Sequence, residues 1–248
     1  MRNNEMAKYY FIALLIFVNV SCGNNRVVDE KATEIVKRCI EAHGGNNYKQ
    51  LDVSFDYRQF RIHLKQEGDH FLYERSTTDS LNNEVHDALT NDGFTRKING
   101  TKQDLTKQES EKYHEGLNAI AYFVLLPYKL SEPAVNLKYL GEINIGNNAY
   151  DKVYVTFEKE DGGNDHQDEF CYWINKNTHT LDYLSYSNGG PRFRKAKERQ
   201  KVDGVIFQDY ENYEILDTTI STDQYDKAFI AGKVKLLSTI EQDNYSSK

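Results

Sequence analysis

Residues 170–186 read FCYWINKNTHTLDYLSY, and this stretch decides the fold class. Two aromatic-rich runs, 169–175 and 181–186, are separated by the polar turn 176–179. Aromatic residues favour strands, and a short polar connection between two such runs lets them pair antiparallel. The stretch therefore predicts two neighbouring antiparallel strands.

Alternation of apolar and polar residues continues on both sides of this stretch. Apolar residues recur at every second position, as in strands with one solvent-facing side. Turn signals such as Asp203-Gly204 separate the runs. Their short spacing favours an antiparallel meander over repeated βαβ units. The further predicted strands are 53–58, 60–64, 71–75, 94–98, 138–143, 149–157, 193–199, 205–213 and 234–240.

Two segments have a helical period instead. Asp29 can cap the first, whose apolar residues recur at three- and four-residue spacing until Gly44 ends the helix. The second stops at Pro127, and its last part, 119–126, is almost wholly apolar. A helix of this composition needs a large apolar partner surface, which a curved sheet would provide.

The N-terminus has the three parts of a secretory signal. Arg2 and Lys8 precede an apolar run over 9–20, and small residues follow it. The run is shorter than the roughly 20 residues of a membrane-spanning helix. We therefore expect residues 1–21 to be a signal peptide, with a short membrane anchor or a buried helix as the alternative.

Cys22 follows this run in a setting that resembles a lipobox, the site at which a cysteine becomes lipid-modified. Asn19 departs from that pattern, which usually has an aliphatic residue three places before the cysteine. We expect a lipidated Cys22 and tether over 22–28, and a single domain over 29–248. Because Gly23 rather than Asp follows the cysteine, a periplasm-facing lipoprotein of the outer membrane is expected.

The composition argues against some partners. The formal net charge is −7, whereas nucleic-acid binding needs clustered Lys and Arg, so no nucleic-acid partner is expected. No segment after the signal is apolar for long enough to span a bilayer. Cys39 falls on a helical stripe and Cys171 in a strand. Two separate buried thiols are favoured over a disulfide.

The order of these segments resembles the outer-membrane lipoprotein carrier superfamily, the LolA/LolB-like proteins. The resemblance rests on a lipobox, a helix ending in His43, strands with an embedded helix, the tryptophan strand 170–175 with its returning strand, and the hairpin 202–207. It implies an α+β fold in which a strongly curved antiparallel sheet, an incomplete barrel, wraps around one or two helices. It also implies an aromatic-lined cavity that shelters acyl chains.

The sequence departs from the carriers in its own expected lipidation and in lacking a clear apolar protruding loop. Binding of a lipid or another hydrophobic ligand is therefore expected, rather than lipoprotein sorting. The chain has 18 Tyr and 12 Phe, and tyrosine suits the wall of a half-wet pocket. The alternative is that these rings simply fill the core of the sheet. The cavity candidates are Tyr57, Phe157, Tyr172, Trp173, Tyr183 and Phe207.

Three further residues are candidates for a polar site. His43 can hydrogen-bond the helix end. Arg192 and Arg194 belong to the basic stretch 192–201, which could receive a carboxylate, a phosphate or an anionic headgroup. A solvated strand face protected by lysines is the alternative for this stretch.

The loop 161–169 holds several oxygen ligands and one imidazole, so Asp165, His166 and Asp168 are weak candidates for a metal site. A solvated hairpin loop is the favoured interpretation. We find no nucleophile elbow, zinc-helix motif, P-loop or dinucleotide fingerprint, and expect no cofactor and no enzyme activity. The alternatives are an envelope hydrolase or metal-dependent enzyme using this loop, and a structural envelope-assembly partner without a small ligand.

Overall fold

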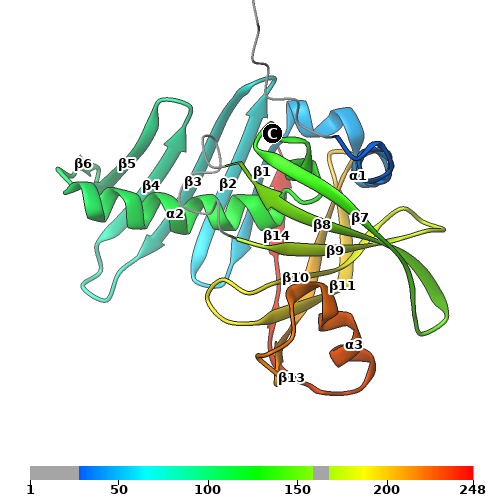
Figure 1. The fold of residues 1–248 in the computed structure, drawn as a ribbon. Coiled ribbons are helices and arrows are strands. Elements are labelled where there is room, and N and C mark those ends of the chain that lie inside the picture. Colours follow the sequence, from blue (N-terminus) through cyan, green and yellow to red (C-terminus); the bar gives the residue numbers. More distant parts are fainter. Residues whose placement is uncertain (1–27, 159–167, 248) are drawn as a thin grey trace, which may run out of the picture.

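A computed structural model describes residues 28–158 and 168–247 (Figure 1). The expected signal peptide, Cys22 and most of the tether lie outside these residues. So do Asp165 and His166. Within the described ranges, no helix is long and apolar enough to cross a membrane.

The N-terminal half forms sheet A, an antiparallel sheet with the strand order β14-β1-β2-β3-β4-β5-β6. Consecutive strands pair through short turns, but β14 comes from the other end of the chain and pairs with β1. The strands are β1 (Asp52–Tyr57), β2 (Phe60–Glu67), β3 (His70–Thr78), β4 (Glu84–Thr90), β5 (Gly93–Ile98), β6 (Thr101–Lys102) and β14 (Asp243–Ser247).

The C-terminal half forms sheet B, with the order β13-β12-β11-β10-β9-β8-β7. The hairpin predicted from residues 170–186 is present as β9 and β10, with Leu184 opposite Tyr172. The strands are β7 (Val135–Ile145), β8 (Asn148–Phe157), β9 (Phe170–Asn175), β10 (Leu181–Tyr186), β11 (Arg192–Val202), β12 (Val205–Ile215) and β13 (Val234–Ile240).

In the described residues, three α-helices pack on these sheets. Helix α2 crosses the strands of sheet A and ends against sheet B, while α1 and α3 lie on sheet B (Figure 1). They are α1 (Glu30–His43), α2 (Lys107–Val124) and α3 (Tyr225–Ile230), with short 3-10 helices at η1 (Gly45–Gln50), η2 (Tyr128–Ser131) and η4 (Thr222–Gln224).

The helix ends follow from local chemistry. The Asp29 carboxylate accepts the N–H of Ala32 and begins α1, as expected. Thr106 and Glu109 form a reciprocal capping box at the start of α2. Gly44 ends α1 with φ of 151°, and a Cβ there would lie 3.0 Å from the Cα of Val205. Only glycine fits this close approach between α1 and β12.

The core has three parts. One lies between sheet B, α1 and the end of α2, and a second lies between sheet A and α2. The third lies on the opposite face of sheet B, under the segment that contains α3. Cys39 and Cys171 are both buried and free, as favoured above.

The predicted α+β fold, an open antiparallel sheet structure around helices, is confirmed. The strands form two seven-stranded sheets rather than one continuous sheet. The chain passes directly from β13 to β14, so sheet B leads into sheet A at this point. Strands β4, β6 and β14 were not predicted from the sequence.

Candidate functional site

A cavity of about 380 Å³ lies between α2 and one end of sheet B. We call it the aromatic cavity, because five aromatic rings form its wall and Asn118, Asp168 and Asn188 are among the polar residues that line it. The volume falls within the range of small-molecule sites. The five rings belong to Tyr122 and Phe123 of α2, Phe157 of β8, Phe170 of β9 and Tyr186 of β10.

Phe170 lies at the centre of these rings. Its ring centroid is 6.0 Å from that of Tyr122, 6.2 Å from Phe123 and 5.8 Å from Phe157. The Tyr186 ring lies 5.7 Å away on the neighbouring strand. Phe170 is almost fully buried, whereas the four surrounding rings are only half-buried. Phe170 therefore packs behind the wall, and the four half-buried rings leave apolar surface exposed in the cavity.

The strand periodicity explains which rings reach this cavity. On β9, Phe170 and Tyr172 point towards α2, and the Tyr172 hydroxyl shares a 3.0 Å hydrogen bond with the Tyr122 hydroxyl. Burial raises the pKa of Tyr172 well above its usual value, so this hydroxyl stays neutral. Cys171 and Trp173 alternate with them and point towards α3.

A second pocket, of about 210 Å³, adjoins the aromatic cavity. We call it the arginine pocket, because Arg58 and Arg194 are among its lining residues. Ala119 and Phe123 line both spaces. The two cavities are therefore neighbours, and the Phe123 ring contributes to the wall of each.

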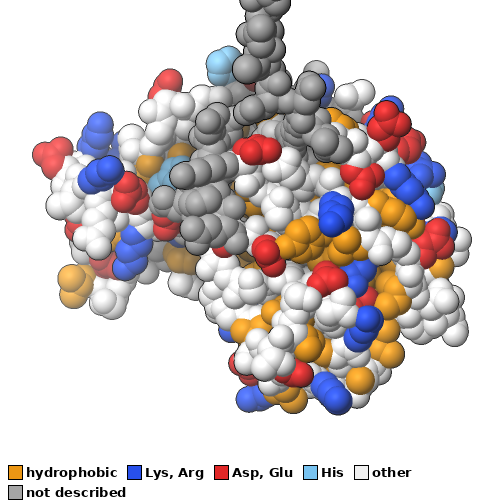
Figure 2. All heavy atoms as spheres, viewed as in Figure 1, with side chains coloured by type: hydrophobic (Ala, Val, Ile, Leu, Met, Phe, Trp, Pro, Cys, Tyr) orange, Lys and Arg blue, Asp and Glu red, His pale blue; other side chains and the backbone are white. Residues whose placement is uncertain are grey.

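A separate groove of about 470 Å³ lies between α1 and the segment from η2 into β7. Val36 and Leu137 are among its apolar lining residues, and Asp29, Lys37 and Glu41 are also in contact with it. Figure 2 shows hydrophobic side chains interspersed with charged ones on the right-hand side of the view, which carries α1 and sheet B. The groove lacks the convergent aromatic wall of the aromatic cavity.

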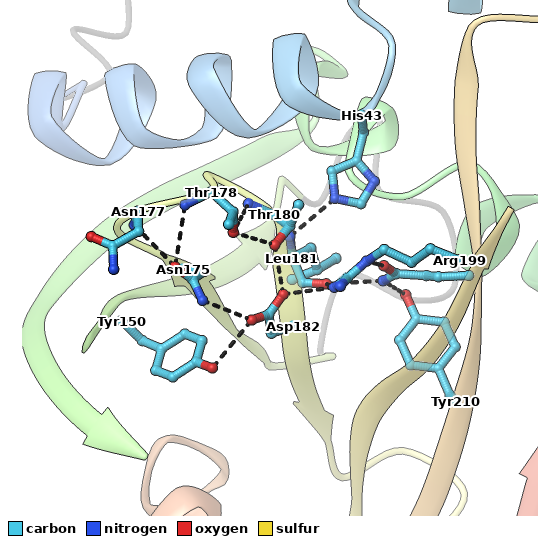
Figure 3. A network of polar contacts seen from close by, with 11 residues as sticks. His43, Tyr150, Asn175, Asn177, Thr178, Thr180, Leu181, Asp182, Arg199 and Tyr210 are labelled. Carbon is cyan, nitrogen blue, oxygen red and sulfur yellow. Dashed lines mark hydrogen bonds and ion pairs between the residues drawn. The ribbon is translucent and has the colours of Figure 1, made fainter. Parts of the chain in front are cut away.

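A network of polar side chains surrounds the start of β10 (Figure 3). Both oxygens of Asp182 are used: Oδ1 accepts from Thr180 and Arg199, and Oδ2 from Tyr150 and Asn175. A carboxylate with all its partners in place is suited to structure rather than to proton transfer. These hydrogen bonds connect the start of β10 to β8 and β11.

His43 belongs to the same region and is fully buried. Its Nε2 accepts the N–H of Leu181 at 3.0 Å, so it binds β10 instead of the end of its own helix. Burial lowers the pKa of His43 to about 4, and the charge of Arg199 adds to this shift. A neutral, buried imidazole that joins α1 to β10 is a structural group.

The predicted cavity residues are distributed over several places. Phe157 lines the aromatic cavity, and Tyr57 lines the arginine pocket. Tyr172 lies behind the wall of the aromatic cavity, where its hydroxyl is hydrogen-bonded to that of Tyr122. Trp173 and Tyr183 lie in the core under α3, and Phe207 lies in the core of sheet A. Tyr122, Phe123, Phe170 and Tyr186 were not selected from the sequence.

The predicted polar residues also differ in their surroundings. Arg192 donates to the carbonyl of Pro191, whereas Arg194 is buried with its guanidinium against the face of the Phe123 ring. Asp168 accepts a hydrogen bond from Asn188 at the aromatic cavity. In residues 28–158 and 168–247, no group of three or more His, Cys, Asp and Glu side chains is arranged to hold a metal ion.

A model of a protein family described as a family of unknown function, DUF6503, matches residues 8–242. No curated protein matches the sequence. The chain is similar in structure to a LolA superfamily protein from Nitrosomonas europaea, at 8% identity and a TM-score of 0.47, over 88% of this chain and 93% of that one.

Two further structures are similar at the same level. A DUF1329 family protein from Desulfovibrio piger has 9% identity and a TM-score of 0.44, over 87% of this chain and 92% of that one. A putative outer membrane lipoprotein-sorting protein domain from Vibrio parahaemolyticus has 9% identity and a TM-score of 0.42, over 81% and 98%. The LolA-like superfamily that the sequence resembles is thus represented among these structures.

Proposed function

This chain belongs to the DUF6503 family, a family of unknown function, and we propose that it binds a lipid or another hydrophobic molecule in the aromatic cavity. The observation that carries the proposal is the cavity wall, in which half-buried rings from α2, β8 and β10 converge around Phe170. Burying an alkyl chain against such a wall contributes about 0.8 kcal/mol for each methylene removed from water.

The proposal includes a place for the protein in the cell. Residues 1–21 act as the signal peptide, Cys22 carries the lipid, and 22–28 tether the single domain 29–248 to the membrane. The protein is then a periplasm-facing envelope lipoprotein of the outer membrane. Support comes from the basic, apolar and small-residue segments at the N-terminus.

The proposal assigns no catalysis to the cavity. Asp168 and Glu132 are the two carboxylates among its described lining residues. Asp168 accepts from Asn188 and Glu132 accepts from Lys129. An acid–base pair would need two such groups converging on one reacting atom.

Filling the cavity tests the proposal. Ala119 is exposed on α2 and lines the cavity, so Ala119→Trp places a large ring in the ligand space. We expect wild-type protein to bind the neutral dye Nile red, and Ala119→Trp to weaken that binding by at least about tenfold, equivalent to about 1.4 kcal/mol. Fluorescence titration measures both affinities, and mass spectrometry identifies lipids that co-purify with the wild type.

Lys112→Trp is the matched control, because Lys112 is exposed on the same helix and lines none of the cavities described above. This variant should bind Nile red as the wild type does. Thermal melting checks that both variants are folded, since exposed substitutions change stability by only about 0.5 kcal/mol. Equal Nile red affinity in wild type and Ala119→Trp would refute the aromatic cavity as the binding site.

A further inference from the structure

Among the residues that the structure describes, 28–158 and 168–247, Arg194 is a buried cation without an anionic partner. It lies on β11 with 9% of its surface exposed, and in the described part of the chain its buried Nε has no hydrogen-bond partner. Its Nη2 donates to the hydroxyl of Tyr186 at 2.6 Å, which is a neutral acceptor. A buried charge of this kind is costly unless an opposite charge compensates it.

The described residues around Arg194 do not supply that charge. The arginine pocket is lined by Arg58 and Arg194, and its described lining residues include no Asp or Glu. Asn212, which faces Arg194 across the β11–β12 pair, also leaves its buried Oδ1 without a partner in the described chain. The two neighbouring side chains therefore do not satisfy each other. The pocket combines two positive charges with one unused donor, the Arg194 Nε, as an anion site requires.

The arginine pocket is next to the proposed ligand. The Arg194 guanidinium carbon is 4.0 Å from the centroid of the Phe123 ring and 5.0 Å from that of Tyr186. Both rings line the aromatic cavity, and Phe123 lines the arginine pocket as well. A ligand whose apolar part contacts the aromatic wall can therefore reach Arg194 with a polar end.

We propose that the ligand is an anionic amphiphile, whose carboxylate or phosphate headgroup is bound by Arg194 and Arg58 while its alkyl chain lies in the aromatic cavity. This inference rests on the function proposed above and adds the charge of the ligand to it. Arg194 supplies the buried donors. Arg58, exposed at the same pocket, adds a second positive charge.

Displacement of Nile red from the wild-type protein tests the headgroup. The competitors are palmitate, hexadecyl phosphate and 1-hexadecanol, which share a sixteen-carbon chain length and differ in their polar end. We expect palmitate or hexadecyl phosphate to displace the dye at a concentration at least about tenfold below that of hexadecanol, as a charge-assisted hydrogen bond predicts. The more effective anion identifies the headgroup.

Four variants locate the effect. Arg194→Met should reduce the preference for the anion over hexadecanol to less than about threefold, with each variant's competitors compared against its own Nile red affinity, and Arg194→Lys should retain part of the preference. Arg58→Met should also lower the preference, and its exposed position protects folding. Lys201→Met removes one positive charge from an exposed position on the same strand and should leave the preference unchanged.

Each result separates the two proposals. Displacement by all three competitors at equal concentrations would overturn the anionic ligand and leave the hydrophobic cavity in place. A Lys201→Met variant that loses as much preference as Arg194→Met and Arg58→Met would also overturn it, because net charge alone would then explain the effect. Failure of the wild type to bind Nile red or any of the competitors would overturn both proposals.

Discussion

His43 shows at the scale of one residue how burial determines protonation. It ends α1, and its neutral Nε2 accepts the N–H of Leu181, which begins β10. The folded-state pKa is about 4, below the ordinary 6.5, because the charged form would lose its hydration. Unfolding therefore takes up a proton between these two values.

The sign of this linkage gives a pH prediction. The stabilisation is complete above pH 6.5 and decreases as the pH falls towards 4, and at pH 5 about 2 kcal/mol should be lost through His43 alone. His43→Gln, whose amide oxygen can accept the same N–H, should remove this part of the pH dependence. Urea unfolding of both proteins at pH 7.5 and pH 5 measures the difference. Parallel losses of stability in the two proteins would contradict the assignment.

Single residues also show where sequence reasoning stops. The alternation along β9 is enough to separate Phe170 and Tyr172 from Cys171 and Trp173. Which of these two faces meets α2 and which meets α3 depends on tertiary packing, so Trp173 was selected for a cavity that it does not line. The basic stretch pointed to Arg194, but its alternation could not reveal a buried guanidinium without an anion.

At the scale of one element, the segment that contains α3 covers the outer face of sheet B. Asp226 of α3 is fully buried and accepts from Lys152 Nζ at 3.2 Å and from Trp173 Nε1 at 3.1 Å. Lys152 also donates to the carbonyl of Asp223, and Ser185 to that of Thr222. A helix of only six residues is thus attached to the sheet by buried polar contacts in addition to its apolar ones.

Breaking the central ion pair should loosen this segment. Asp226→Ala leaves the Lys152 ammonium buried without its anion, and we expect a loss of about 3–5 kcal/mol in the free energy of unfolding. The double variant Lys152→Met/Asp226→Ala removes both charges and should recover a large part of that loss. Trp173 is the only tryptophan, so its fluorescence during urea unfolding reports on this site. The single variant Lys152→Met completes the comparison. If the double variant loses as much free energy of unfolding as Asp226→Ala and Lys152→Met lose together, the two residues are not a coupled pair.

The missed strands have a physical explanation at the same scale. Strand β4 carries Asp87, whose charge indicates a solvent-exposed segment in the sequence. In the structure Asp87 is 1% exposed, and its carboxylate accepts from Arg75 and Arg96 on the two neighbouring strands. Strand β14 reads DNYSS, which has no apolar alternation, and it is a strand because β1 offers it an open edge.

At the scale of the whole molecule, the two sheets meet at an aromatic cluster. Tyr245 of β14 lies with its ring centroid 5.3 Å from Phe55 of β1 and 5.2 Å from Phe207 of β12. Phe55 belongs to sheet A and Phe207 to sheet B, and both rings are buried. The last strand of the described chain therefore joins the two halves, and we expect them to unfold together.

Replacing Tyr245 tests whether its ring couples the two sheets. Tyr245→Ala should lower the free energy of unfolding by about 2–3 kcal/mol, near the lower end for loss of a packed aromatic side chain. Tyr245→Phe keeps the ring and loses the hydrogen bond to Gln242, so it should cost only about 1 kcal/mol. Circular dichroism and Trp173 fluorescence should give coincident unfolding curves for the wild type. Two separate transitions would mean that the sheets are independent units.

The pairing of β14 with β1 also sets the order of events in time. Residues 243–247 form β14 and are synthesised after the other described strands. The edge that they complete belongs to β1, the first strand in the chain order. Closing so long a loop is slow, because its entropy is lost before the contact is gained. The N-terminal sheet consequently stays unfinished while the ribosome is still adding residues.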